Sequence, residues 1–161
     1  MIDISVRENI NIRDKRITVI GLGLSGLETA KLANHLGARV FVSDSGSTKM
    51  ISAHAMDLMH SHHIASETGL HSEKIYDADL WILSPGVPKN ADIIIKAQEK
   101  NIPIVGEIEF ASWFTETPIV AVTGSNGKTT TAYILTEMCQ SKSNHAAVSY
   151  THLTLPTIYS V

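Results

Sequence analysis

A strand that leads directly into a glycine-rich turn and then into a helix constrains the fold of this chain most. Arg16–Ile20 is predicted to be a strand, and it runs into the sequence GLGLSG at Gly21–Gly26. Ser25–Leu36 is predicted to be a helix, which Gly37 ends as a natural helix terminator. A strand, a tight turn and a helix in this order are typical of the start of a parallel sheet with helices on its faces.

The same alternation continues for most of the chain. Further strands are predicted at Arg39–Ser43, Leu80–Leu83 and Ile104–Val105, and further helices at Lys49–His62, Ala91–Lys100 and Glu107–Trp113. Regular alternation of short strands and helices indicates a parallel sheet covered by helices on both sides. We therefore expect an α/β fold with a Rossmann-like parallel sheet domain.

The first glycine turn also has the features of a nucleotide-binding site. G-x-G-x-x-G between a strand and a helix is the dinucleotide fingerprint, and Asp44 ends the next strand, where an acidic residue can bind a ribose hydroxyl. Taken alone, these residues favour NAD, and an NAD-binding module of a dehydrogenase or of a redox-sensing regulator is one interpretation. The structural alternative is a glycine turn that only lets helix and strand approach closely.

A second strand–loop–helix unit follows at Pro118–Thr131, with the sequence PIVAVTGSNGKTTT. The apolar run Ile119–Val122 predicts a strand buried on both faces, and Thr130–Gln140 predicts a helix. In the turn between them, backbone N–H groups can converge on an anion, Lys128 can neutralise outer phosphates, and the Thr129 hydroxyl can bind magnesium. The loop is two residues shorter than the usual G-x-x-x-x-G-K-[ST] pattern. The alternative is a structural strand–helix turn.

Composition limits the class of protein. With 161 residues, 43% hydrophobic residues and a net charge of −3, the chain suits one globular domain and little more, and it has no electrostatic case for nucleic-acid binding. The one cysteine excludes an intrachain disulfide and fits a reducing compartment. No apolar run approaches the roughly 18 residues of a membrane-spanning helix. We expect a cytoplasmic protein without membrane insertion.

Three motifs in order resemble the Mur ligases of peptidoglycan synthesis, and among them the branch that adds D-glutamate. The motifs are GLGLSG at Gly21–Gly26, SPGVP at Ser84–Pro88 and TGSNGKTTT at Thr123–Thr131, and the segment IPIVGEIEFA at Ile102–Ala111 supports them. The resemblance covers about residues 14–140. It implies an ATP-dependent, amide-forming acid–amino-acid ligase, acting in cell-wall biogenesis and so in cell shape and cell division. The partners implied are UDP-N-acetylmuramoyl-L-alanine and D-glutamate, with ATP and Mg²⁺ as cofactors and a monomeric protein.

The resemblance also implies which residues form the two sites. The UDP-linked substrate would be bound by Gly21, Gly23, Leu24, Ser25, Gly26, Asp44, Ser45, Ser84, Pro85 and Gly86. ATP would be bound by Gly124, Ser125, Asn126, Gly127, Lys128, Thr129 and Thr130, with Lys128 as the catalytic residue and Thr129 as a metal ligand. ATP would phosphorylate the alanyl carboxylate, and the D-glutamate amine would attack the acyl phosphate.

The domain organisation expected from these motifs has three parts. Residues 1–117 form a Rossmann-like domain that binds the UDP-linked substrate, and residues 118–143 form the first strand, P-loop and helix of a truncated central ATP-binding domain. Residues 144–161 have neither a helical pattern nor a strand–turn rhythm, and we expect a tail that is non-native or disordered. The family's ligases have further domains, so this chain is expected to be an N-terminal fragment without activity of its own.

Overall fold

The computed structural model describes residues 10–88, 91–140, 148–150 and 157–159. The chain divides into two compact units, Met1–Thr115 and Glu116–Val161. None of the helices in the described ranges is both long and apolar enough to cross a membrane.

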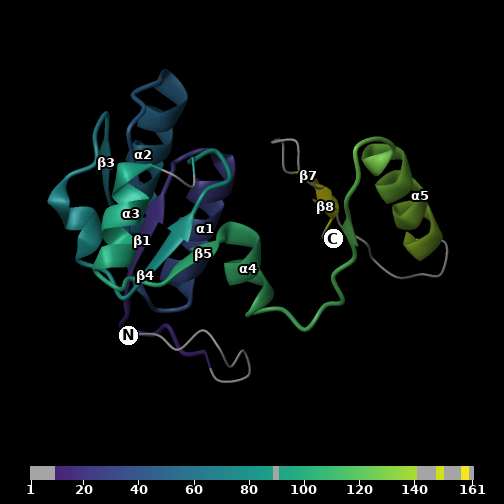
Figure 1. Ribbon diagram of the computed structural model, residues 1–161, viewed down its shortest axis with the longest axis horizontal. Helices are drawn as coiled ribbons and strands as arrows, with labels where there is room; N and C mark the ends of the chain where they lie inside the picture. The colour runs from purple at the N-terminus through teal and green to yellow at the C-terminus, as the bar shows by residue number, and fades with distance from the viewer. Residues whose placement is uncertain (1–9, 89–90, 141–147, 151–156, 160–161) are drawn as a thin grey trace. The chain divides into compact units, whose positions relative to one another are not determined.

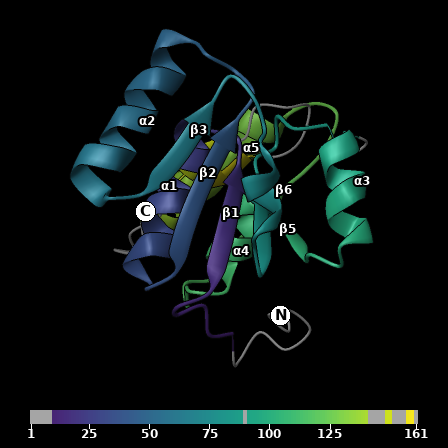
Figure 2. The same cartoon turned by 90° about the vertical axis from the view of Figure 1, so that its left-hand side faces the viewer.

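A five-stranded, wholly parallel sheet forms the centre of the first unit. Its strands are β1 (Arg16–Ile20), β2 (Arg39–Asp44), β3 (Ala65–Thr68), β4 (Leu80–Leu83) and β5 (Ile104–Gly106). They lie in the order β3-β2-β1-β4-β5, and every neighbouring pair is parallel. Figure 2 shows β3, β2 and β1 side by side. The expected α/β fold with a parallel sheet is confirmed.

Helices cover both faces of this sheet. On one face lie α1 (Leu24–His35), α2 (Lys49–His62) and α4 (Glu107–Ser112), and on the other lie α3 (Asp92–Glu99) and the 3-10 helix η2 (Glu73–Tyr76). Figure 1 shows α3 and α1 on opposite sides of the strands. Strand side chains alternate between the faces. Accordingly, Ile17 and Val19 of β1 belong to the α1-side core, while Ile20 belongs to the α3-side core.

The order of the strands reverses beside β1. After β1 the chain moves outward to β2 and β3, and it then returns to the other side of β1 to form β4. Helices that leave the carboxyl ends of β1 and β4 therefore diverge to opposite faces of the sheet. Such a reversal of strand order is the place where open α/β sheets bind their ligands.

The second unit contains β6 (Ala121–Val122), α5 (Lys128–Gln140), β7 (Val148–Tyr150) and β8 (Thr157–Tyr159). Its strands form an antiparallel sheet in the order β6-β8-β7. The two short strands β7 and β8 lie in a stretch where the sequence predicts no regular element. Three residues are too few to carry a recognisable strand pattern.

The expected buried strand at Ile119–Val122 is wrong in both extent and burial. Only Ala121–Val122 is a strand, and the side chains of Ile119 and Val120 are 47% and 59% exposed. A strand is buried on both faces only when its neighbours and a helical layer cover it. In the described part of the second unit, one helix and two three-residue strands supply too little of that cover.

Candidate functional site

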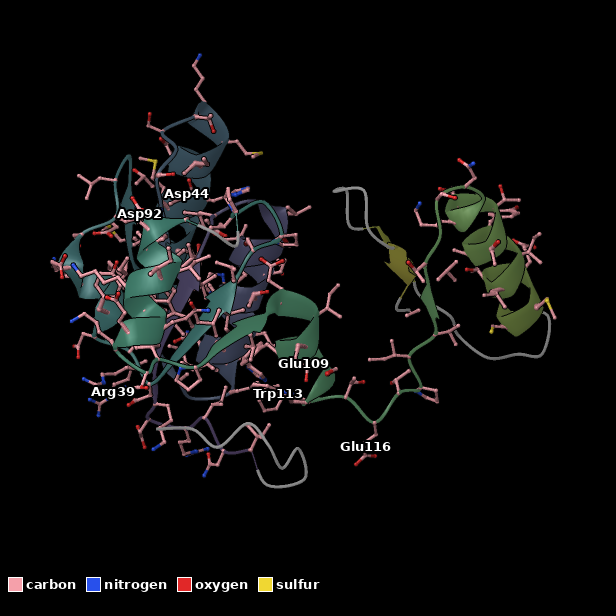
Figure 3. All side chains as sticks on the ribbon, viewed as in Figure 1. Arg39, Asp44, Asp92, Glu109, Trp113 and Glu116 are labelled. Carbon is pink, nitrogen blue, oxygen red and sulfur yellow. The ribbon has the colours of Figure 1, made fainter. Side chains whose placement is uncertain are left out.

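The residues predicted to bind the UDP-linked substrate come from three loops at the carboxyl edge of the sheet. Gly21–Gly26 follows β1, Asp44 ends β2 and Ser45 follows it, and Ser84–Gly86 follows β4. Figure 3 labels Arg39 at the start of β2 and Asp44 at its end, and so shows the direction in which the parallel strands run. All ten residues therefore belong to loops, a strand end or a helix end on the side of the sheet where the parallel strands end.

Two of the three motif glycines, Gly21 and Gly26, are required by the packing within the protein. Gly21 has a φ of +104°, and a Cβ added there would lie 2.6 Å from the Ser84 Cβ. At Gly26, an added Cβ would overlap the carbonyl oxygen of Gly21. Both positions allow α1 and the turn after β1 to approach β4, which is the packing role of glycines in such turns.

Gly23 is different, because the protein leaves the space beside it open. Its φ is −67°, which any residue adopts, and no atom lies within 4 Å of a Cβ added there. Gly23 is also the N-cap of α1 and has no side chain to pair with the first N–H groups of the helix. By contrast, the Thr48 hydroxyl caps α2 by accepting from the Ile51 N–H at 3.3 Å. An uncapped helix N-terminus beside free space is suited to an anion.

Asp44 joins the glycine turn to the loop after β2. One carboxylate oxygen accepts from the Leu22 N–H at 2.6 Å, and the other accepts from the Gly46 N–H at 2.6 Å. The side chain thus fixes the turn in addition to any contact with a ligand. A second contact to the same turn comes from His54 of α2, whose Nδ1 lies 3.0 Å from the Leu22 carbonyl oxygen.

Most of the remaining predicted residues are exposed. Leu24, the first residue of α1, has a large apolar side chain that is 69% exposed. Ser25, Ser45, Pro85 and Gly86 are also exposed. Ser84 is buried, and its N–H donates to the Ile20 carbonyl at 2.9 Å, so it extends the β1–β4 ladder. An apolar surface next to free backbone donors can serve the base or sugar of a nucleotide.

Glu107 is a site residue that the sequence motifs do not identify. It is the first residue of α4 and only 6% exposed, and its carboxylate accepts from the Ser84 hydroxyl. The Ser25 hydroxyl is a second hydrogen-bond partner. Burial raises the pKa of the Glu107 carboxyl, and the hydrogen bonds from Ser84 and Ser25 oppose that rise. The sequence signals for this position are an acidic residue at the start of a predicted helix and its place in the segment Ile102–Ala111, and neither indicates contact with the glycine turn.

A polar network joins β2, β3 and the loop after β3, and the sequence motifs do not predict it either. The Ser43 hydroxyl lies 2.7 Å from both Glu67 Oε1 and His71 Nδ1, and Ser72 donates its N–H and its hydroxyl to Glu67. Burial would raise the pKa of Glu67, but the hydrogen bonds from Ser72 and Ser43 outweigh it, and the pKa is lowered. The network holds the loop after β3 against β2.

The predicted ATP-binding residues all lie in the second unit. Gly124 and Gly127 have φ values of +150° and +76°, which favour glycine, and α5 begins at Lys128. Lys128 Nζ donates to the carbonyl oxygen of Gly124 and, at 3.4 Å, to that of Ser125. The lysine therefore reaches back over the loop. Thr129 and Thr130 are exposed in the first turn of α5.

The first unit defines the chain as a parallel α/β protein with a candidate anion-binding turn at its topological switch point. Residues 15–106 match the family described as Mur ligase MurD-like, N-terminal domain. This match covers more than half of the chain, and the chain belongs to that family.

Individual relatives agree with the family assignment. UDP-N-acetylmuramoylalanine--D-glutamate ligase of Chlorobium chlorochromatii is 40% identical over 131 residues, which are 81% of this chain and 28% of that protein. The protein of the same name in Christiangramia forsetii is 47% identical over 117 residues, which are 72% of this chain and 26% of that protein. The chain thus spans about a quarter of the length of these relatives.

A solved structure shows the same fold at low sequence identity. It is UDP-N-acetylmuramate:L-alanyl-gamma-D-glutamyl-meso-diaminopimelate ligase from Neisseria meningitides, with a TM-score of 0.54 and 21% identity. The similarity covers 78% of this chain and 39% of that chain. At this identity the similarity concerns the fold alone.

Proposed function

We propose that this chain is the N-terminal part of an ATP-dependent ligase that adds D-glutamate to UDP-N-acetylmuramoyl-L-alanine in peptidoglycan synthesis. The proposal rests on one observation above all: a chain of the MurD-like family leaves the N-terminus of α1 uncapped and open at the switch point of its sheet. We also propose that the whole protein acts as a cytoplasmic monomer.

In this proposal the first unit binds the UDP part of the substrate. The diphosphate accepts hydrogen bonds from the N–H groups at Gly23–Gly26, where the helix dipole favours negative charge. Leu24 offers its exposed side chain to the uridine, Asp44 and Ser45 approach from β2, and Ser84–Gly86 approaches from β4. The two hydrogen bonds that Asp44 already accepts keep the glycine turn in the shape that this binding needs.

The second unit is proposed to bind ATP at Gly124–Thr130. The glycine conformations, the exposed loop and the helix that starts at Lys128 suit a triphosphate. Lys128 would contact the outer phosphates, and Thr129 would hold Mg²⁺, which neutralises charge on the phosphoryl group when bound. The γ-phosphoryl group would pass to the alanyl carboxylate with loss of ADP. The D-glutamate amine would then attack the acyl carbon and expel phosphate, which forms the amide.

The binding of UDP-N-acetylmuramoyl-L-alanine by the 161-residue chain tests the proposal. We expect saturable heat in isothermal titration calorimetry with this ligand, weaker but measurable heat with UDP, and none with NAD. The physical reason is that the open helix N-terminus accepts any diphosphate, whereas the exposed loops after β2 and β4 are proposed to select the uridine.

An NAD-binding module is the interpretation that this experiment would support instead. Saturable binding of NAD without any response to UDP would contradict the ligase proposal and would assign Gly21–Gly26 and Asp44 to a dinucleotide. In that case Asp44 would bind a ribose hydroxyl with the lone pairs that its hydrogen bonds to the Leu22 and Gly46 N–H groups leave available.

We further expect the 161-residue chain to release no phosphate when UDP-N-acetylmuramoyl-L-alanine, D-glutamate, ATP and magnesium are supplied together. Alignment of three reactants depends on groups held in a fixed geometry. The chain matches only 28% of the Chlorobium relative. A coupled phosphate assay against a no-protein blank measures this. Phosphate release that requires both D-glutamate and the UDP-linked substrate would contradict the expectation.

A further inference from the structure

One buried carboxyl group stands directly behind the proposed diphosphate site and has no part in the proposed function. Glu107 accepts from the hydroxyl of Ser84 at the end of β4 and from that of Ser25 in the first turn of α1. These two serines lie just after the carboxyl ends of the neighbouring strands β1 and β4. Glu107 therefore joins three elements, α4, β4 and α1, at the place where a phosphate group would arrive.

The surroundings of Glu107 contain little charge that could balance it. The helix α4 packs against α1, β4 and β5, and the two strands carry no ionisable side chain. On α1, Lys31 pairs with Glu28 at 3.2 Å and with Asp57 of α2 at 3.0 Å, and His35 lies in the last turn. On α4 itself, Glu109 accepts from the Trp113 ring N–H. Burial and the hydrogen bonds from the two serine hydroxyls determine the shift of the Glu107 pKa. No charged side chain of the described residues contributes to that shift.

We propose that Glu107 is a positioning residue for the diphosphate. When Glu107 is ionised, it turns the Ser25 and Ser84 hydroxyls away from the ligand. When Glu107 takes up a proton, it releases them. The inference rests on the proposed function, because it assumes that a UDP-linked ligand binds at Gly21–Gly26. It adds that binding of this ligand is accompanied by uptake of one proton.

Both the number of hydrogen-bond donors and the charge of Glu107 bear on the binding of a diphosphate. Each serine hydroxyl has one proton, and a carboxylate that accepts it leaves only lone pairs to face the phosphate oxygens. An ionised, buried carboxylate behind the helix N-terminus also repels the diphosphate through a medium of low dielectric constant. Protonation removes both penalties. An anion that arrives at this site thus favours the protonated form of Glu107, in the same direction as burial already does.

A purely structural role would have different consequences. In that case Glu107 would only hold α4 against the sheet, and the affinity for the ligand would not depend on the protonation of Glu107. The variant Glu107→Gln separates the two roles, because the amide has the shape of the acid and the charge of its protonated form. Glu109→Gln is the matched control, since it makes the same change two residues away on the same short helix.

The test is calorimetric titration of the 161-residue chain with UDP-N-acetylmuramoyl-L-alanine between pH 6 and pH 8.5. None of the charges of this ligand titrates in that range. We expect the dissociation constant of the unchanged chain to rise with pH, by up to about tenfold per unit once Glu107 is ionised. Glu107→Gln should have a flatter profile and the tighter binding at pH 8.5, whereas Glu109→Gln should follow the unchanged chain. His54, which faces the glycine turn, is present in all three proteins.

Titration in two buffers of different ionisation enthalpy counts the protons taken up and needs no variant. Uptake approaching one proton at high pH, lost in Glu107→Gln, supports the proposal. A profile that is flat in the unchanged chain, or equally steep in Glu107→Gln, overturns it, as does weaker binding by a folded Glu107→Gln at every pH. Absence of binding by the unchanged chain at every pH contradicts the proposed function itself, and the inference with it.

Discussion

Replacing Gly23 with valine is expected to remove binding of the UDP-linked substrate and to leave the fold intact. No atom lies within 4 Å of a Cβ at this position, and its backbone conformation suits any residue. The added isopropyl group therefore displaces only what would bind there, which we propose to be the diphosphate. We expect affinity to fall by at least a hundredfold, or about 2.7 kcal/mol, measured by calorimetry. The melting temperature should fall only slightly, because valine is a poorer N-cap residue than glycine.

Gly26→Ala is the matched comparison and should behave in the opposite way. A Cβ at Gly26 would overlap the Gly21 carbonyl oxygen and approach the Ser84 hydroxyl oxygen at 3.1 Å. We expect a loss of stability of about 1–3 kcal/mol from this overpacking, seen as a lower midpoint in urea unfolding. If Gly23→Val binds the UDP-linked substrate normally, the glycine turn is only a packing device and the proposed site is wrong.

The second large effect is expected for Lys128→Ala in a protein that has the full length of its relatives. The Lys128 ammonium is proposed to contact the outer phosphates, and its stabilisation of the transferring phosphoryl group should exceed its stabilisation of bound ATP. Turnover should fall at least about a hundredfold, which is about 2.7 kcal/mol of barrier. Steady-state release of phosphate measures the change.

The affinity of that same variant for UDP-N-acetylmuramoyl-L-alanine provides the control. It should be almost unchanged, because Gly21–Gly26 belongs to the first unit and Lys128 to the second. Lys128 also donates to the Gly124 and Ser125 carbonyl oxygens, so a melting curve is needed to show that the loop is intact. Near-normal turnover would mean that Gly124–Thr129 is a structural turn, and the proposed ATP site would have to be abandoned.

Elements with a strong local pattern could be predicted from the sequence, and weakly patterned ones could not. Arg16–Ile20, Lys49–His62 and Leu80–Leu83 are predicted with the bounds that the structure has, and the other predicted elements of the first unit differ by one residue at one or both ends. The strand β3 was missed because Ala65–Thr68 is a polar edge strand without an apolar face. Its place is determined by the backbone ladder with Phe41–Asp44 of β2, which no local pattern reveals.

The residues of the candidate site also divide into those that local sequence patterns predict and those that they do not. The glycine turn was recognisable because its conformation depends on adjacent residues, and the loops after β2 and β4 because short motifs mark them. Glu67 and His71 were not recognisable, since their partner Ser43 lies on another strand. Their role becomes visible only when the parallel pairing of β2 and β3 brings the strand ends together.

By itself, the sequence determined the alternation of strands and helices, the glycine turn at Gly21–Gly26 and the family to which the chain belongs. These features depend on neighbouring residues, whose steric and hydrogen-bonding preferences act locally. Only the tertiary structure decided that Gly23 faces open space while Gly21 and Gly26 do not, and that Glu107 lies buried against Ser25 and Ser84. The physical reason is the strand order, because β4 beside β1 brings distant segments of the chain to one edge of the sheet.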